Sequence, residues 1–298
     1  MKDNKKKILI LGSTGMLGSE VLKVFSDLDN YKIFTNLRNL KQKKTFKINN
    51  LNKITFFKFD AKINNINELK KYITRDTIII NCIGIIKPHI NESSQDSVFN
   101  AIQINSSFPH QLNTKFSQNK IYQIATDCVF SGKKGLYTEN DFHDAEDVYG
   151  KTKSLGEVNK KNFFNIRTSI IGKELNSSKS LYEWFASQKH KAKLNGFKNH
   201  SWNGLTTKAF AMIVISIIEN NINIPNNIHI MPKDIISKYK MLNLFKKKLN
   251  KNILIKPTIA KIKINRTLTT IYPKIVKKIW LGSKFKKIPK LKDLISEM

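Results

Sequence analysis

Short apolar runs alternate with helical patterns along most of the chain. The runs predict buried strands at 7–11, 31–35, 54–59, 77–82, 121–125, 163–171 and 227–231. Between them, apolar residues at helical spacing predict helices at 15–28, 67–73, 102–118, 151–158 and 207–219. This alternation is typical of a parallel sheet that helices cover on both faces. We therefore expect an α/β fold with a doubly wound parallel Rossmann sheet.

The alternation stops at 173–205 and again after 232, where aromatic and basic residues lie among irregular segments. Late inserts in an α/β sheet usually lie over the carboxyl ends of the strands, where ligands bind. The pattern predicts an NAD(P)-binding core over 1–172 and 206–232. A smaller C-terminal substrate-binding lobe is expected from 173–205 and 233–298.

A glycine motif connects the first predicted strand to the first helix. It reads Gly12-Ser-Thr-Gly15-Met-Leu-Gly18. Glycines allow a tight turn and let a pyrophosphate approach backbone N–H groups at a helix N-terminus. In this strand–turn–helix context the motif predicts a dinucleotide site. The expected cofactor contacts here are Gly12, Thr14, Gly15, Met16, Leu17 and Gly18.

The end of the second predicted strand bears on which dinucleotide binds. An NAD site usually has an acidic residue there, but this strand ends in Asn36-Leu37-Arg38. Arg38 could hold a 2′-phosphate, which favours NADPH, with NADH as the alternative. Asp60 ends the third strand and is a candidate partner for the adenine amino group, or a helix cap.

Tyr149 and Lys153 form a Tyr-x-x-x-Lys pair on a predicted helix. Residues four apart share a helix face, so the ammonium would lie near the phenol and lower its pKa. Such a phenol can act as a general acid toward a ketone oxygen. Thr126, at the end of the fifth strand, would donate a hydrogen bond to the same oxygen. These three residues are the predicted catalytic set.

Taken together, the motifs resemble those of the extended short-chain dehydrogenase/reductases, in the dTDP-4-dehydrorhamnose reductase branch. The resemblance rests on Gly12 to Gly18, Asn81-Cys-Ile-Gly84, Asn105, Ala125-Thr-Asp-Cys-Val-Phe-Ser-Gly132, Tyr137-Thr-Glu139, Tyr149 to Lys153, Ile166-Arg-Thr168 and Trp202-Asn-Gly-Leu-Thr-Thr207. It implies NADPH-dependent reduction of the 4-keto group of a nucleotide-linked 6-deoxysugar for polysaccharide or O-antigen synthesis.

The resemblance also implies further roles. Asn105 would stand behind Lys153 in a proton relay. Asn81, Cys82 and Gly84 would line the cofactor. The expected substrate contacts are Cys128, Phe130, Arg167, Trp202 and Thr206, with lobe packing as the alternative for Arg167 and Trp202.

The triplet Thr126-Asp127-Cys128 separates related reactions. A sugar-nucleotide 4,6-dehydratase carries Thr-Asp-Glu, and this chain lacks the Glu. An epimerase-reductase of the GDP-fucose synthase type has a cysteine at this spacing and a downstream histidine, for which His190 and His200 are candidates. Cys128 could instead be a small buried apolar residue. A non-catalytic NAD(P)-binding regulatory subunit is a further alternative.

Composition narrows the partners. The 298 residues carry 53 Lys+Arg and 22 Asp+Glu, a net charge of +31. Only four of the basic residues are Arg, which argues against nucleic acid as the partner. The absence of a long apolar run argues against a membrane span, and two cysteines argue against a disulfide framework. We expect a cytoplasmic protein and consider a homodimer. No metal ligands are assigned; a Mg²⁺ requirement is left open.

Overall fold

The computed structural model describes residues 5–175 and 180–298. By its contacts the chain divides into two compact units. The first unit comprises Met1–Ala125, Glu146–Ile166 and Ile224–Ile228, and the second comprises Thr126–Ala145, Arg167–Asn223 and His229–Met298. Segments 126–145 and 206–223 thus group with the C-terminus. The division into a cofactor core and a substrate lobe, with the bounds expected above, remains a prediction about function.

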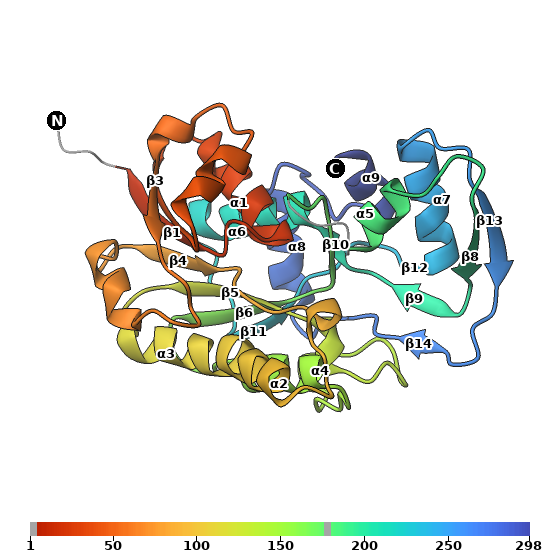
Figure 1. The fold of residues 1–298 in the computed structure, drawn as a ribbon, viewed down its shortest axis with the longest axis horizontal. Helices are drawn as coiled ribbons and strands as arrows, with labels where there is room; N and C mark the ends of the chain where they lie inside the picture. Colours follow the sequence, from red (N-terminus) through yellow and green to blue (C-terminus); the bar gives the residue numbers. More distant parts are fainter. Residues whose placement is uncertain (1–4, 176–179) are drawn as a thin grey trace. The chain divides into compact units, whose positions relative to one another are not determined.

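A seven-stranded sheet forms the centre of the first unit. Its strand order is β11-β6-β5-β4-β1-β2-β3 (Figure 1). The strands are β1 (Lys6–Leu11), β2 (Tyr31–Leu37), β3 (Ile54–Lys58), β4 (Ile78–Asn81), β5 (Ile121–Ala125), β6 (Phe163–Arg167) and β11 (Asn227–His229). The registered pairs β1–β2, β1–β4, β2–β3 and β4–β5 are parallel. The order turns back at β1, which confirms the doubly wound parallel sheet.

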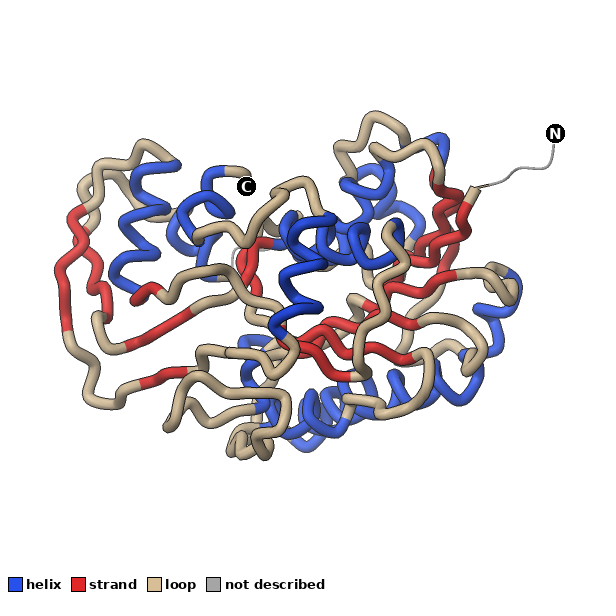
Figure 2. Tube along the Cα trace, turned by 180° about the vertical axis from the view of Figure 1, so that it is seen from behind, coloured by secondary structure: helices blue, strands red, loops and turns tan. Residues whose placement is uncertain are grey.

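Helices lie on both faces of this sheet. Helix α1 (Met16–Ser26) covers one face, and α2 (Gln95–Ile102), α3 (Phe108–Lys115) and α4 (Val148–Leu155) cover the other (Figure 1). Seen from behind, the same strands lie side by side above the latter helices (Figure 2). Because both faces are covered, the strands are apolar almost throughout, and Ile8 to Leu11 are fully buried.

The second unit consists of helices around three small sheets with strand orders β10-β7, β12-β9-β14 and β13-β8. Its helices are α5 (Leu181–Ala186), α6 (Thr207–Glu219), α7 (Lys238–Lys248), α8 (Pro273–Gly282) and α9 (Leu291–Ser296). Its strands are β7 (Ile170–Ile171), β8 (Lys193–Phe197), β9 (His200–Trp202), β10 (Leu205–Thr206), β12 (Ile236–Ser237), β13 (Leu254–Thr258) and β14 (Ile264–Asn265). The Lys-rich C-terminal segment is therefore folded, and Trp280 is fully buried.

Three predicted helices and one predicted strand differ in detail from the structure. The helix expected at 151–158 is α4 (Val148–Leu155), and the strand expected at 163–171 is divided into β6 and β7. The helix expected at 67–73 is a 3-10 helix, Ile66–Lys71, which an Asn65–Glu68 capping box begins. The helix expected at 102–118 begins earlier, because Ser94 caps α2, and a π-helical turn at Gln103–Ser107 separates α2 from α3. Periodicity alone does not indicate a π turn. Among the described residues, no helix has the length and apolar character needed to cross a bilayer.

Candidate functional site

The turn between β1 and α1 requires glycine at two positions. Gly12 has φ +85°, and a Cβ there would lie 2.9 Å from the Cys82 carbonyl carbon. A Cβ on Gly18 would lie 2.2 Å from the Gly12 carbonyl oxygen. Both approaches are closer than packed atoms allow, so these glycines are needed for the turn itself.

Gly15 is different, because its conformation does not require glycine. It is the N-cap of α1 with φ −82°, no described side chain caps the helix, and a Cβ would be 3.4 Å from the Gly12 carbonyl oxygen. Gly15 is exposed, and Thr14 and Met16 are half-buried. The first turn of α1 contains no acidic residue. An uncapped helix N-terminus with bare backbone beside it is suited to a phosphate group.

Asn36 holds this turn against β2, which the sequence analysis did not foresee. Its Oδ1 accepts from Gly12 N at 2.8 Å, and its Nδ2 donates to the Phe59 carbonyl at 2.9 Å. Ser13 Oγ donates to the Asn36 carbonyl at 3.1 Å. Asn36 is buried. A carboxylate at this position could not donate to the Phe59 carbonyl and would be buried without that bond. The sequence signal for this role was that β2 ends without an Asp or Glu.

Arg38 and Asp60 lie just beyond β2 and β3. Arg38 follows Leu37 and is exposed, which leaves its guanidinium available to a ligand. Asp60 Oδ1 accepts from Lys62 N at 2.9 Å, and Asn64 Oδ1 accepts from Asp60 N at 2.7 Å. Asp60 therefore closes a local turn and is not a helix cap, since Asn65 caps the next helical segment. An adenine contact by Asp60 remains a prediction.

Helix α4 carries Tyr149 and Lys153 one turn apart, as predicted. Asp147 caps the helix by accepting from Gly150 N at 2.8 Å. Lys153 is 7% exposed, and its Nζ donates to the Ile124 carbonyl at 3.0 Å. Burial lowers the pKa of Lys153 to about 8, although Glu157 and Cys82 act in the opposite direction. The ammonium is thus held at β5, two residues before Thr126.

Asn105 lies in the π-helical turn and connects three segments. Its Oδ1 accepts from Ile85 N at 2.8 Å, and its Nδ2 donates to the Ile85 carbonyl at 3.0 Å and to Thr152 Oγ1 at 3.2 Å. A Cβ on Gly84 would lie 3.4 Å from Asn105 Oδ1 and 3.9 Å from Lys153 Nζ. Gly84, Asn105 and Lys153 are therefore close neighbours, as the relay hypothesis requires.

Asn81 ends β4, and Cys82 follows it beside the glycine turn. Asn81 is fully buried; its Nδ2 donates to Gln123 Oε1 at 2.9 Å, and its Oδ1 accepts from Ile83 N at 3.1 Å. Burial raises the pKa of the Cys82 thiol to about 12, so it is protonated near neutrality. These residues shape the end of the strand through buried polar contacts. Their contact with a cofactor remains a prediction.

In the second unit, Thr126 caps a 3-10 turn, Asp127–Val129, and its Oγ1 accepts from Cys128 N at 3.1 Å. Cys128 Sγ donates to Asp127 Oδ1 at 3.7 Å. Burial raises the pKa of Asp127, although Arg266 acts in the opposite direction. Burial and then Arg266 lower the pKa of Lys238, while Cys128 raises it. Two cations from the C-terminal segment thus accompany this turn, and no sequence motif signalled them.

Phe130 and Arg167 lie in the core of the second unit. Phe130 is fully buried and stacks on Tyr137 with ring centroids 4.2 Å apart, and Arg167 lies 5.3 Å above its ring. Arg167 is 1% exposed and contacts the Nε2 atoms of His229 and His143, the latter at 2.9 Å. This geometry matches the lobe-packing alternative for Arg167. Substrate contact by Phe130 or Arg167 remains a prediction.

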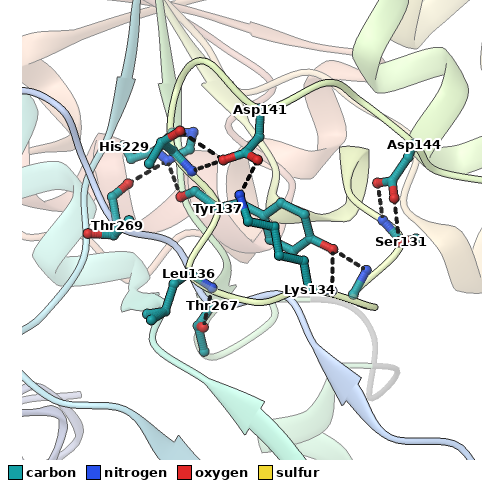
Figure 3. Close-up of polar contacts among 11 residues, drawn as sticks. Ser131, Lys134, Leu136, Tyr137, Asp141, Asp144, His229, Thr267 and Thr269 are labelled. Carbon is teal, nitrogen blue, oxygen red and sulfur yellow. Dashed lines mark hydrogen bonds and ion pairs between the residues drawn. The ribbon is translucent and has the colours of Figure 1, made fainter.

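His229 is a buried neutral histidine that the sequence analysis gave no role. Its Nδ1 donates to the carbonyls of Thr269 at 2.8 Å and Tyr137 at 3.1 Å (Figure 3). Burial and Arg167 lower its pKa to about 4. Glu139 anchors the same place, because its Oε1 accepts from His229 N at 2.8 Å. The network fixes the loop that follows Thr126 to His229 and Thr269, within the second unit.

Acidic residues of the segment 139–147 accept hydrogen bonds that hold this loop in its conformation. Asp141 accepts from Thr138 N at 2.7 Å and pairs with Lys134, and Asp144 accepts from Ser131 N at 2.7 Å (Figure 3). Lys134 and the Thr138 bonds lower the pKa of Asp141 to about 2. Within the described ranges, no three His, Cys, Asp or Glu side chains are placed to share a metal ion.

The two remaining predicted substrate contacts lie on β9 and β10. Trp202 is half-buried, and its position pairs with Ile236 of β12. Thr206 is 1% exposed, and its Oγ1 accepts from Ala209 N at 3.2 Å, which makes it the cap of α6. Thr206 thus has a structural role that accounts for its burial, and the substrate role of both residues remains a prediction.

Comparison with known proteins places the chain in a family. The family model described as RmlD substrate binding domain matches residues 6–267. The beta subunit of methionine adenosyltransferase 2 from Rattus norvegicus is 26% identical over 154 residues, which are 51% of this chain and 42% of that protein's length. The matched segment thus spans less than half of this curated relative.

Solved structures share the fold over nearly the whole chain. A dTDP-4-dehydrorhamnose reductase from Yersinia enterocolitica has a TM-score of 0.73 at 19% identity, with 98% of both chains covered. The Bacillus anthracis reductase in complex with NADP has a TM-score of 0.71 at 16% identity, again with 98% of both chains covered. The fold and the family match confirm the resemblance seen in the motifs. The chain belongs to the RmlD substrate binding domain family.

Proposed function

We propose that the protein reduces the 4-keto group of a nucleotide-linked 6-deoxysugar, with NADPH as the hydride donor. The single observation that carries this proposal is Lys153, a buried ammonium at 3.0 Å from the Ile124 carbonyl, on the same helix as Tyr149. Family membership supports the same reaction, and polysaccharide or O-antigen synthesis is the pathway that would use the product.

The chain's residues fit a nicotinamide dinucleotide at the first unit. Bare backbone at Gly15 and the uncapped start of α1 would receive the pyrophosphate. Arg38 would pair with a 2′-phosphate, which is the reason for preferring NADPH to NADH. When bound, the cofactor supplies the hydride that adds to ring carbon 4 of the sugar.

Tyr149 would donate its phenolic proton to the ketone oxygen, so that the carbonyl becomes a hydroxyl as the hydride adds to carbon. Lys153 would stabilise the resulting phenolate and hold the nicotinamide ribose. Thr126 would orient the oxygen. Asn105, which contacts Ile85 and Thr152, would support the path by which Tyr149 regains a proton.

The test is NADPH oxidation with dTDP-, UDP- and GDP-linked 4-keto-6-deoxysugars, with product analysis. Tyr149→Phe should lower the rate by about 10²-fold to 10⁴-fold and leave NADPH binding nearly unchanged. Tyr72→Phe is the matched control, because Tyr72 stacks on Phe57 at 3.8 Å and Phe preserves that contact. No oxidation with any of the three substrates, or full activity of Tyr149→Phe, would contradict the proposal.

Cys128 favours an epimerase-reductase as the second candidate. Its thiol donates to Asp127 and interacts with the charge of Lys238, while the candidate partner His200 is placed with Nε2 at 3.1 Å from the Ile262 carbonyl oxygen. Turnover in deuterated water separates the two reactions, since label at ring carbon 3 or 5 requires epimerisation. The partial match to a methionine adenosyltransferase subunit supports a third candidate, a non-catalytic NAD(P)-binding subunit, and any turnover excludes it. A homodimer, a cytoplasmic location and a Mg²⁺ requirement stay as sequence predictions.

A further inference from the structure

Strands β8 and β13 form a two-stranded parallel sheet in the second unit, and only one of its faces is covered (Figure 1). Helix α7 packs on the inner face, where a Cβ on Gly196 would lie 2.9 Å from Tyr239 Cα. Lys193 and Leu254 are register partners, so their side chains share the outer face. No described element covers that face, and Leu254 is 59% exposed.

The segment directly after β13 carries two further exposed aliphatic residues, both isoleucines. Ile259 is 70% exposed and Ile262 is 74% exposed. Their backbone is fixed: Asn199 Nδ2 donates to the Ala260 carbonyl at 2.8 Å, and Asn199 Oδ1 accepts from Ala260 N at 2.9 Å. Large aliphatic side chains held outward on an ordered segment are typical of an interaction site.

Exposed lysines flank these apolar residues along the same segments of the chain. The exposed ones are Lys193, Lys198, Lys256, Lys261 and Lys263. The sequence has no Asp or Glu between 235 and 292, so acidic side chains of this segment do not offset the charge. We name the surface formed by these five lysines with Leu254, Ile259 and Ile262 the basic-apolar ridge.

We propose that the basic-apolar ridge docks on an anionic lipid bilayer surface. Lysines would lie at the acidic headgroups, and the aliphatic side chains would enter the headgroup–acyl boundary. Charge complementarity and exposed aliphatic groups on the same ridge carry this choice. Nucleic acid is disfavoured as the occupant, because the basic residues of the ridge are all lysines and offer no arginine forks.

The test is cosedimentation of the full chain with vesicles of phosphatidylcholine alone and of phosphatidylcholine mixed with phosphatidylglycerol. We expect binding only to the mixed vesicles, and its loss at high salt. The variant with Lys256→Gln, Lys261→Gln and Lys263→Gln should bind about a hundredfold more weakly, since each lysine near the surface contributes on the order of 1 kcal/mol. Its matched control has Lys274→Gln, Lys277→Gln and Lys278→Gln on α8, which removes the same charge from exposed positions outside the ridge.

The apolar contribution is tested with Ile259→Ser combined with Ile262→Ser, for which we expect a loss of about tenfold or more. Ile63→Ser is the control, because Ile63 is 74% exposed in the first unit. Urea unfolding should be alike for all variants, as every substituted side chain is exposed. Equal loss in the ridge lysine variant and its α8 control would mean attraction by net charge alone and would overturn the proposal. So would absence of binding to the mixed vesicles, or ridge-dependent binding to duplex DNA in place of vesicles.

Discussion

The two units build their candidate sites by different physical means. In the first unit, backbone forms most of the site: two glycines permit the turn, a third leaves helix α1 uncapped, and Lys153 is held by a carbonyl. In the second unit, buried side chains form most of the candidate site, and Arg167 and His229 lie in the core. Backbone sites leave a readable glycine motif. A network of side chains from segments far apart in the sequence leaves no motif of that kind.

The largest expected effect tests whether the first unit depends on the buried ammonium of Lys153. Lys153→Met should lower kcat/KM by about 10²-fold to 10⁴-fold, because the ammonium that favours phenolate is lost while an unbranched stem still fills the space. Steady-state kinetics measure this, with Lys151→Met, an exposed position on the same helix, as the control. If Lys153→Met retains normal activity, the catalytic assignment of α4 is wrong.

Two glycine substitutions should separate fold from function in the turn. Gly18→Ala places a Cβ 2.2 Å from the Gly12 carbonyl oxygen, so we expect a loss of about 3 kcal/mol or more in the free energy of unfolding. Gly15→Ala should cost about 1 kcal/mol or less, because its φ of −82° suits alanine. It should still weaken NADPH binding about tenfold or more by blocking the pyrophosphate. Urea unfolding and NADPH titration measure the two effects, and equal destabilisation would contradict the distinction.

Acid should weaken the second unit through His229. Its folded-state pKa of about 4 lies below the unfolded value of 6.5, so the unfolded state binds the proton first as pH falls. The stabilisation is complete above pH 6.5 and is lost progressively down to about pH 4, by roughly 3 kcal/mol. Urea unfolding across this range should show a shallower decline for His229→Gln. An identical slope in both proteins would show that His229 is not the cause of the loss of stability in acid.

The smallest effect concerns Arg38, the one exposed charge assigned to the first unit's site. Arg38→Ser should lower the preference for NADPH over NADH about tenfold, since one charge-assisted hydrogen bond to the 2′-phosphate is lost. The ratio of kcat/KM for the two cofactors measures this. Arg75→Ser removes another exposed arginine of the same unit and should leave the ratio unchanged.

What could be predicted from the sequence follows the same division. The strands of the first unit and the glycine turn were predictable, because apolar period and backbone demands are local. Asn36 was not assigned a role, since its partners Gly12 and Phe59 come together only in the folded sheet. The π-helical turn at Asn105 was missed because its neighbours on either side have ordinary helical spacing.

The second unit was predicted less well for a physical reason. Arg266 and Lys238 accompany Thr126 to Cys128 from more than a hundred positions away, and a lysine-rich segment gives no local cue to single them out. Arg167 was expected to face the substrate, with packing as the alternative. Its burial depends on His229 and Phe130, whose separation in sequence hides the cluster.

The course of the chain has a consequence for biosynthesis. The first unit takes its last segment from Ile224–Ile228, so its sheet lacks the edge strand β11 until that stretch has left the ribosome. The second unit likewise needs both Thr126–Ala145 and the C-terminal segment. The first unit can therefore be completed before the second during translation. A transcript truncated before codon 224 would yield an unfinished sheet with an open edge, a natural substrate for chaperones and proteases.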